Sequence, residues 1–435
     1  MSKPGLHLKH FGFFLAFFLF IGCGKEDAPP TPPEPDPLQI SVDTDITYQT
    51  IAGFGGANRM WGTRFLKPAE AQTAFGLGED GLGLSLFRVR IASDEAEWPL
   101  ILESVQAAQS HGVKILASPW SPPAELKSNN SDVGGNLPEE NFEGFKGHLN
   151  SFISYMAANG VDIYAISIQN EPDISVSYES CDWTSSRMAN FIKTYGPLIE
   201  GAKIAAPESF NFSQSFTNTL LFDAETAENF DIVAGHIYGG GLAPFPLAEQ
   251  KGKEVWMTEY LLNLNVGQSG APAWATYDEE TKWAETLTML NTVHQAMSNN
   301  WNAYIWWYLR RYYSFLGDGE QGTTNGEILK RGYAFSQFSK YVRPGFVRVE
   351  TGINRSSDLQ VTAYDGSDQV VVVVINPEAT AVNKLNVKAP SVSSAAAYVT
   401  SLDKNREPAT VELAGDTTAV LDILPESVTT IVIGK

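Results

Sequence analysis

The chain has 435 residues, of which 43% are hydrophobic and 18% are charged, and its formal net charge at pH 7 is −20. This composition is ordinary for a globular protein, and the length suggests two domains or one large barrel with an appendage. The acidic residues are scattered and are interpreted as a solvated surface, and their sign argues against a protein that binds nucleic acid or an anionic membrane.

The first 22 residues have the features of a secretory signal peptide. Lys3 and Lys9 precede or flank an apolar stretch at residues 11–20, which is too short to span a bilayer. The stretch leads to the sequence Phe-Ile-Gly-Cys, which ends at Cys23 and resembles a bacterial lipobox. The resemblance implies that Cys23 is lipidated and becomes the mature N-terminus. The alternative is an ordinary signal peptide with an incidental cysteine.

A short tether follows. The sequence Cys-Gly-Lys-Glu-Asp, which starts at Cys23, is similar to the signal that sends some lipoproteins to the outer cell surface. Residues 28–37 are rich in proline and are expected to be extended and semi-rigid. We therefore expect residues 1–22 to be a signal peptide and residues 23–37 a lipidated cysteine with its tether. The expected location is the outer membrane, at the cell surface.

The cysteines and glycines give no sign of a metal or an organic cofactor. The chain has only two cysteines, so if Cys23 is acylated, Cys181 has no partner for an internal disulfide. Cys181 is interpreted as a small core side chain rather than a nucleophile. No zinc-type spacing of Cys and His occurs, and no nucleotide-binding glycine pattern lies between a strand and a helix.

Strand-like and helix-like segments alternate from residue 49 to residue 343. Strands are expected at Gln49–Phe54, Leu84–Ile91, Val113–Pro119, Asp162–Gln169, Lys203–Ala206, Ile232–His236, Glu254–Glu259 and Ala303–Tyr308. Helices are expected at Glu95–His111, Glu140–Asn159, Ser185–Ile199, Glu279–Asn300 and Arg331–Tyr341. Eight βα units in roughly 300 residues predict an α/β fold of the (β/α)8 TIM barrel type.

The pattern changes after Pro344. Short β-rich segments at Val370–Ile375, Ala395–Thr400, Ala419–Ile423 and Val428–Ile433 are separated by turn residues, and no helix of useful length is expected. Residues 344–435 therefore predict a small side domain, an antiparallel β-sandwich. The strand-like residues 38–48, upstream of the barrel, are expected to join it.

Two glutamates give the strongest indication of function. Glu171 follows the apolar run Ile-Ser-Ile-Gln-Asn, and Glu259 ends the run Val-Trp-Met-Thr-Glu. A charge there is costly unless the strand ends at a polar mouth, and the carboxyl ends of barrel strands form the active-site face. Two carboxylates about 5 Å apart are the apparatus of a retaining glycosidase. We assign Glu171 as the acid/base and Glu259 as the nucleophile; the alternative for each is a surface turn.

Other residues at expected strand ends support this assignment. Arg88 lies in an apolar run and needs an anionic partner if it is buried, and Glu259 is the natural candidate. Asn170 is placed to hydrogen-bond a sugar hydroxyl, and Trp120 to offer an aromatic face to a sugar ring. Two further residues, His236 and Tyr238, share one face of their strand, and Tyr238 is placed to donate to the nucleophile. For these last two and for Trp120, core packing is the alternative.

The motifs around these residues resemble glycoside hydrolase family 30, a clan A group of retaining enzymes. They read Leu-Phe-Arg-Val, Ala-Ser-Pro-Trp-Ser-Pro-Pro, Ile-Gln-Asn-Glu-Pro, His-Ile-Tyr and Trp-Met-Thr-Glu. The resemblance covers about residues 40–435. It implies a barrel fused to a side β-domain and the same roles for Glu171 and Glu259.

A finer resemblance begins at residue 304, where the sequence Tyr-Ile-Trp-Trp-Tyr-Leu-Arg-Arg-Tyr-Tyr is similar to bacterial glucuronoxylan endo-β-1,4-xylanases of subfamily 8. The resemblance implies that Arg311 grips the carboxylate of a glucuronic acid branch, with Trp307 and Tyr313 beside it. A guanidinium suits that task because it binds a carboxylate through two parallel hydrogen bonds. The alternative for Arg311 is a structural salt bridge.

The chain departs from those xylanases after the nucleophile. They continue Thr-Glu-His-Tyr, and that tyrosine also contacts the uronate, whereas this chain has Leu261 in its place, which cannot donate a hydrogen bond. The loop after Leu261 is longer and different, and residues 314–329 contain Asp318, Glu320 and Glu327. Dependence on glucuronic acid branches is therefore an open question.

The leading hypothesis is a retaining hydrolase that cleaves β-1,4-xylosidic bonds of (glucurono)xylan, a tethered monomer whose partners are the polysaccharide and the membrane lipid. A second hypothesis keeps the fold and changes the substrate to β-1,6-glucan, β-1,6-galactan or a β-glucoside. A third is a surface lipoprotein that binds glycan without cleaving it, which has no need of both glutamates.

Overall fold

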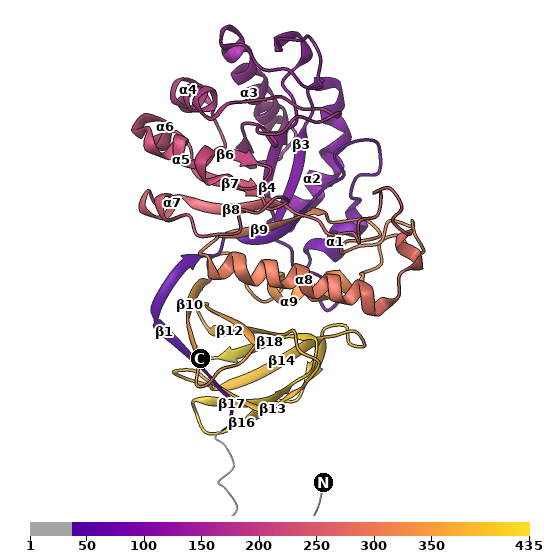
Figure 1. The fold of residues 1–435 in the computed structure, drawn as a ribbon, viewed down its shortest axis with the longest axis vertical. Helices are drawn as coiled ribbons and strands as arrows, with labels where there is room; N and C mark the ends of the chain where they lie inside the picture. The colour runs from indigo at the N-terminus through magenta and orange to yellow at the C-terminus, as the bar shows by residue number, and fades with distance from the viewer. Residues whose placement is uncertain (1–36) are drawn as a thin grey trace, which may run out of the picture. The chain divides into compact units, whose positions relative to one another are not determined.

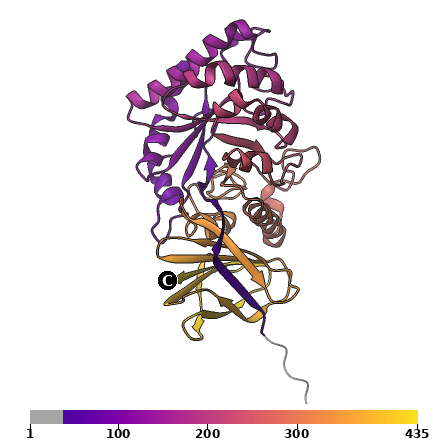
Figure 2. The same ribbon diagram turned by 90° about the vertical axis from the view of Figure 1, so that its left-hand side faces the viewer.

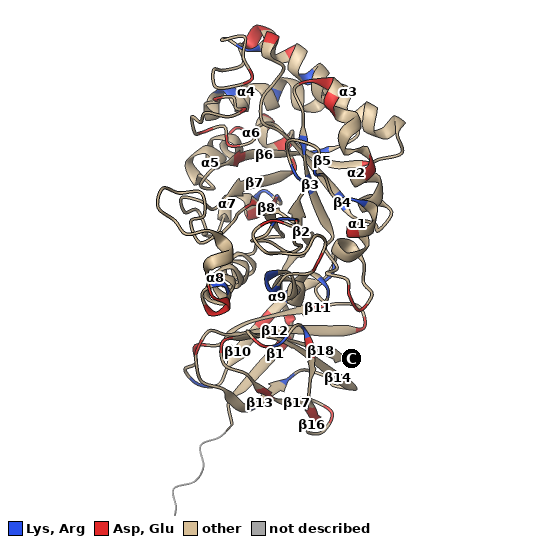
Figure 3. Ribbon diagram, turned by 90° about the vertical axis from the view of Figure 1, so that its right-hand side faces the viewer, with Lys and Arg blue, Asp and Glu red and all other residues tan. Residues whose placement is uncertain are grey.

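The computed structural model describes residues 37–435, and the predicted signal peptide, Cys23 and nearly all of the tether lie outside the described residues. The described chain forms a closed barrel of eight parallel strands and a sheet of ten strands (Figure 1). Charged residues of both signs are interspersed over both parts rather than gathered in one block (Figure 3). Within residues 37–435, no helix combines the length and the hydropathy needed to cross a membrane.

The barrel strands follow each other in chain order around the ring, and β9 closes the barrel by pairing with β2. They are β2 (Gly53–Ala57), β3 (Leu86–Ile91), β4 (Lys114–Pro119), β5 (Ile163–Ser167), β6 (Lys203–Ser209), β7 (Ile232–His236), β8 (Glu254–Glu259) and β9 (Ala303–Tyr308). Every residue of β3 is buried. Such strands read as continuous apolar runs because helices cover a parallel sheet from outside while side chains fill the barrel inside.

Helices lie outside the barrel strands (Figure 1). The α-helices are α1 (Pro68–Phe75), α2 (Leu102–Gln109), α3 (Phe142–Ala158), α4 (Ser185–Tyr195), α5 (Gln214–Phe222), α6 (Ala224–Glu228), α7 (Pro246–Gln250), α8 (Glu279–Ser298) and α9 (Lys330–Ser339). The 3-10 helices are η1 (Glu95–Ile101), η2 (Ala124–Leu126), η3 (Glu139–Asn141), η4 (Gly196–Leu198) and η5 (Trp274–Thr276). On α3 the buried side chains Phe145, Leu149, Phe152 and Met156 recur at helical spacing, which directs one face to the core.

Some predicted boundaries were wrong. The expected strand Gln49–Phe54 is two strands, because β1 (Gln39–Thr50) continues to the pair of Thr50 with Val347, and the first barrel strand begins only at Gly53. The expected helix Glu95–His111 begins as 3-10 helix η1, which contains Pro99 and gives way to α2 at Leu102. Proline lacks the N–H that a continuous α-helix needs there.

The second part is one continuous sheet in the order β15-β14-β18-β12-β11-β10-β1-β13-β17-β16. Its strands, besides β1, are β10 (Val347–Ile353), β11 (Gln360–Asp365), β12 (Gln369–Asn376), β13 (Val382–Lys388), β14 (Ser394–Thr400), β15 (Glu407–Ala409), β16 (Glu412–Leu413), β17 (Thr418–Ile423) and β18 (Ser427–Gly434). The sheet curls so that strands from its two halves share one apolar core. β1 lies between β10 and β13 and runs parallel to β13, so the sheet is not purely antiparallel (Figure 2).

The sheet is attached to the barrel through β12, which is buried on both faces. Val370 and Val372 point into the core of the curled sheet, whereas Val371 and Val373 belong to the large core of the barrel. Trp283 of α8 donates from Nε1 to the carbonyl oxygen of Glu426, at 2.8 Å. The continuous apolar run of valines in β12 follows from this position between two cores.

Candidate active site

Glu171 and Glu259 lie together at the carboxyl ends of two barrel strands. Glu171 follows β5 and Glu259 ends β8, and each is 6% exposed. A carboxylate oxygen of one lies within 4.8 Å of a carboxylate oxygen of the other, and a ring nitrogen of His236 lies within the same distance of both. This separation matches the two carboxyl groups of retaining glycosidases, about 5–5.5 Å apart, and not the 6.5–9.5 Å of inverting ones.

The backbone at this mouth is strained. Glu171 has a φ angle of 46° and Glu208 of β6 has 59°, both in the left-handed region that favours glycine. The N–H of Glu171 donates to the carbonyl oxygen of Glu208 at 3.0 Å, so the two strained residues hold each other. Strain of this kind costs about 1–3 kcal/mol per residue and persists where the surrounding structure enforces it, often at functional sites.

Glu259 is surrounded by donors. Arg88 donates from Nη1 to Oε2 at 2.6 Å, and the hydroxyl of Tyr238 donates to Oε1 at 2.8 Å. Burial raises the pKa of the Glu259 carboxyl, while the charges of His236 and Arg88 oppose that shift. Because a guanidinium is always charged, the ionised carboxylate is the form that fits these contacts. Glu259 is thus held as an anion facing the pocket, as a nucleophile requires.

Glu171 has partners of a different kind. His236 Nδ1 lies 3.0 Å from Oε1, and the hydroxyl of Tyr178 donates to Oε2 at 3.1 Å. Burial disfavours a charged imidazole, but Glu259, Glu171 and Glu208 outweigh it and raise the pKa of His236 to about 9. Burial also raises the pKa of Tyr178, so its hydroxyl stays protonated. His236 and Tyr178 thus each present a proton to one carboxyl oxygen of Glu171.

Arg88 lies behind Glu259 and is completely buried. Besides Glu259 it contacts Asn170 Oδ1 at 2.6 Å and Glu208 Oε1 at 3.0 Å, both from Nη2, and its guanidinium lies over the ring of Trp120 at 4.8 Å. The anionic partner predicted for Arg88 is thus present.

A pocket of about 590 Å³ opens over the glutamates. It is lined by Trp61, Trp120, Glu171, Tyr178, Glu179, Phe210, Tyr238, Glu259, Leu261 and Trp307. The rings of Trp61 and Trp120 are 5.5 Å apart and those of Trp120 and Trp307 are 6.1 Å apart, so three indoles form a continuous wall. Flat apolar walls with a few polar groups at one point are what a sugar chain requires.

The predicted site residues do not all reach this pocket. The pocket is lined by Trp120, Tyr238 and Trp307 together with the glutamates, while Asn170, Arg88 and His236 are buried behind them. Arg311 and Tyr313 are not among its lining residues. Arg311 donates from Nη1 to Asp318 Oδ2 at 2.7 Å and to Glu320 Oε2 at 2.6 Å, both in the loop that follows it.

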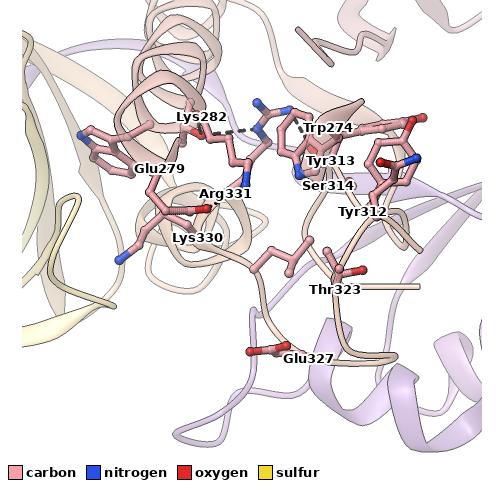
Figure 4. Close-up of a pocket in the computed structure, with 15 residues that line it drawn as sticks. Trp274, Glu279, Lys282, Tyr312, Tyr313, Ser314, Thr323, Glu327, Lys330 and Arg331 are labelled. Carbon is pink, nitrogen blue, oxygen red and sulfur yellow. Dashed lines mark hydrogen bonds and ion pairs between the residues drawn. The ribbon is translucent and has the colours of Figure 1, made fainter. Parts of the chain in front are cut away.

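Tyr313 lines a neighbouring cavity of about 190 Å³ together with Trp274 and Arg331 (Figure 4). Arg331 donates there to the carbonyl oxygens of Tyr313 and Leu262, at 2.7 and 2.6 Å, and to Glu285 at 2.7 Å. Of the three residues predicted to hold a uronate, Trp307 lines the catalytic pocket, whereas Arg311 and Tyr313 do not. Whether they bind a uronate stays a prediction.

Three residues of the site were missed from the sequence. Glu208 carries the same signal as the two catalytic glutamates, a carboxylate at the end of an apolar run, but the predicted strand stopped at Ala206 and left it out. Trp61 and Tyr178 lie in loops, where no periodic pattern marks a side chain that turns toward the mouth.

A parallel barrel with two closely spaced carboxylates at the mouth, one surrounded by donors and one by proton-exchanging groups, defines a retaining glycoside hydrolase. The model of the glycosyl hydrolase family 30 TIM-barrel domain matches residues 81–251. Glucuronoxylanase XynC of Bacillus subtilis is 34% identical over 407 residues, which cover 91% of this chain and 92% of the relative. The chain therefore belongs to glycoside hydrolase family 30.

Solved structures agree with this assignment. A family 30 subfamily 8 xylanase from Clostridium acetobutylicum has a TM-score of 0.80 and 29% identity, covering 91% of this chain and 100% of that one. A family 30 endoxylanase from Clostridium papyrosolvens has a TM-score of 0.78 and 30% identity, with the same coverage.

Proposed function

We propose that this protein cleaves β-1,4-xylosidic bonds in the main chain of xylan with retention of anomeric configuration. The observation that carries the proposal is the pair Glu171 and Glu259, placed within 4.8 Å of each other under an aromatic pocket. The substrate is inferred from the relatives, which are named as a glucuronoxylanase and as family 30 xylanases.

The mechanism uses two displacements. Glu259 attacks the anomeric carbon while Glu171 gives its proton to the departing glycosidic oxygen, which leaves a covalent ester between the sugar and Glu259. Glu171 then takes a proton from a water molecule, and the water oxygen attacks the same carbon and releases Glu259. Arg88 and Tyr238 stabilise the carboxylate of Glu259 before the attack and again as it leaves.

The contacts of Arg311 favour recognition of the xylan main chain over recognition of an acidic branch. Asp318 and Glu320 both accept from Nη1 of Arg311, at 2.7 and 2.6 Å, and Asp318 is buried. A branch carboxylate that approaches the guanidinium is therefore repelled by two acidic side chains that already lie beside it. Leu261 lines the pocket and provides no donor for a uronate. The indole wall, in contrast, contacts a sugar ring whether or not it carries a branch. We infer that glucuronic acid branches are tolerated rather than required.

A product profile tests this function. The protein without its first 22 residues and with Cys23 replaced is incubated with glucuronoxylan and with arabinoxylan that lacks uronic acid, and the oligosaccharides are identified by mass. The proposal predicts cleavage of both. Cleavage of glucuronoxylan alone, with aldouronic products, would restore Arg311 as the selecting residue. Activity on β-1,6-glucan or β-1,6-galactan with none on xylan would keep the hydrolase and replace its substrate.

We also propose that the enzyme is a lipoprotein of the outer membrane, held at the cell surface through Cys23. The support is the charged and apolar leader, the lipobox-like sequence before Cys23 and the proline-rich tether. Metabolic labelling with a fatty acid checks this in cells that express the full chain, with Cys23→Ala as the variant that should lose the label. Retention of label in that variant contradicts lipidation at Cys23.

A further inference from the structure

Glu208 is a third carboxylate in the site and has no part in the mechanism described above. It lies near the end of β6, it is completely buried, and it does not line the pocket. A buried charge of this kind is expensive unless it is paired, so its neighbours indicate its role.

The charged partners of Glu208 are Arg88 and His236, and these two residues also contact the catalytic glutamates. Its Oε1 lies 3.0 Å from Nη2 of Arg88, which contacts Glu259 through its other terminal nitrogen. The same Oε1 lies 3.8 Å from Nε2 of His236, whose Nδ1 lies 3.0 Å from Glu171. Glu208 therefore lies beside both Arg88 and His236, on the side away from the pocket.

Two polar atoms in this arrangement have no hydrogen-bond partner among the described residues, namely Oε2 of Glu208 and Nε2 of His236. The 3.8 Å separation is too long for a hydrogen bond, so the two side chains interact as charges. The charged groups that face His236 are Glu171 after β5, Glu208 of β6, Glu259 of β8 and Arg88 of β3, with the hydroxyl of Tyr238 as a neutral neighbour.

We propose that Glu208 is a positioning residue for catalysis, which keeps His236 protonated beside Glu171 and holds Arg88 against Glu259. It acts through these two residues and does not touch the substrate. The negative charge of Glu208 balances cations that otherwise have only the catalytic glutamates as partners, and those glutamates change charge during each turnover. Arg88 and His236 thus keep one fixed anion while the catalytic carboxylates react. The expected effect of Glu208 on kcat rests on the proposed function, whereas its expected effect on the protonation of His236 does not.

The electrostatics agree with this geometry. Burial alone raises the pKa of Glu208, but Arg88 and His236 outweigh it and lower the pKa to about 2. Glu208 is thus an anion at neutral pH.

The test is Glu208→Gln, which keeps the shape and removes the charge. We expect kcat on xylan to fall about 100-fold, as expected for a small misplacement of catalytic groups, with KM little changed. We also expect the titration of His236, followed by NMR of its ring in the isotopically labelled protein, to move from near pH 9 to lower pH by about one to three units. Glu208→Asp, which restores the charge, should recover most of the lost His236 shift.

Glu70→Gln is the matched control. Glu70 is also a buried glutamate, paired with Arg310 at 2.5 Å, and it lies outside the pocket. It should leave both kcat and the titration of His236 unchanged. Circular dichroism shows whether Glu208→Gln folds. If it does not, Glu208→Asp alone tests the proposal, which then predicts a smaller loss of kcat and a detectable change in the titration of His236.

An unchanged titration of His236 in Glu208→Gln overturns the proposal, whatever happens to kcat. So does a kcat close to that of the parent enzyme. If the parent enzyme cleaves no xylan, the proposed function fails, but the titration still decides whether Glu208 holds the proton on His236.

Discussion

Arg88 and Arg311 each form a cluster with carboxylates near the mouth of the barrel, and only the cluster of Arg88 is built to act on a substrate. Arg88 is fully buried and contacts Glu259, a carboxylate that lines the pocket. Arg311 is partly exposed and contacts Asp318 and Glu320, whose side chains come from its own following loop. An arginine paired with carboxylates therefore supports catalysis at Arg88, whereas at Arg311 it holds a loop.

The two clusters differ in which of their groups remains available to a substrate. In the first cluster, a nucleophile faces open space while the arginine stays behind it. In the second, the arginine is the group that an acidic substrate needs, and two internal carboxylates already accept from its Nη1. The ion pair of Arg311 with Glu320 is also nearer to solvent, where such pairs contribute little stability, about 0–1 kcal/mol.

The sharpest way to separate the clusters is to neutralise the catalytic glutamates. Glu259→Gln and Glu171→Gln should each lower kcat by about a thousandfold or more, because the nucleophile or the proton donor is lost. Initial rates on xylan measure the loss, and circular dichroism checks that the fold is intact. A near-normal rate in either variant would exclude that residue from the chemistry.

A smaller loss is expected from Tyr238→Phe. The change removes the hydroxyl that donates to Glu259 at 2.8 Å, and a hydrogen bond to a charged group contributes about 1.5–3 kcal/mol, which is about 10- to 100-fold in kcat. Tyr260→Phe is the matched control, because that tyrosine packs against Tyr238 with ring centroids 5.6 Å apart but does not line the pocket. Equal losses in both variants would make packing, and not the hydrogen bond, the cause.

The clusters should also differ in how stability depends on pH. The folded-state pKa of His236 is about 9, raised above its ordinary value of 6.5. Its contribution to the free energy of unfolding is therefore fully present below pH 6.5 and is lost as the pH rises through 9; the amount is on the order of 3 kcal/mol.

Chemical denaturation between pH 6 and 10 measures this loss. His236→Gln should flatten the decline, whereas Arg311→Ala, which is remote from His236, should leave its shape unchanged. A decline of the same steepness in His236→Gln would assign the pH dependence to other groups.

The smallest effect is expected when Arg311 is released. Asp318→Asn combined with Glu320→Gln frees the guanidinium and should raise the preference for glucuronoxylan over arabinoxylan a few-fold, about 1 kcal/mol. Arg311→Ala in the otherwise unchanged enzyme should affect both substrates equally. A selective loss on glucuronoxylan in Arg311→Ala would show that the branch already reaches this arginine.

The barrel and its catalytic pair were predictable because both leave local traces. Long apolar runs mark strands that are buried on both sides, and Glu171 and Glu259 are the charges that end such runs. The curled sheet was harder, because its order depends on β1 inserting between strands that are distant in the sequence, such as Ile353 opposite Ile40. Hydrogen-bonded order in a sheet is a long-range property that no local pattern records.

The state of Arg311 was also beyond the sequence. Asp318 and Glu320 were visible as acids in the following loop, but whether they turn back onto the guanidinium depends on the fold of residues 314–329. Glu208 shows the opposite case. Its signal was present, and only the strand boundary set at Ala206 hid it.

The central claim is that Glu171 and Glu259, within 4.8 Å of each other, catalyse a double displacement. Proton NMR of the first products formed from xylan tests it directly, because the anomeric configuration of the new reducing end is visible before mutarotation mixes the anomers. The account predicts that the β anomer appears first, followed by slow formation of the α anomer. Initial formation of the α anomer would mean inversion and would contradict the two-glutamate double displacement.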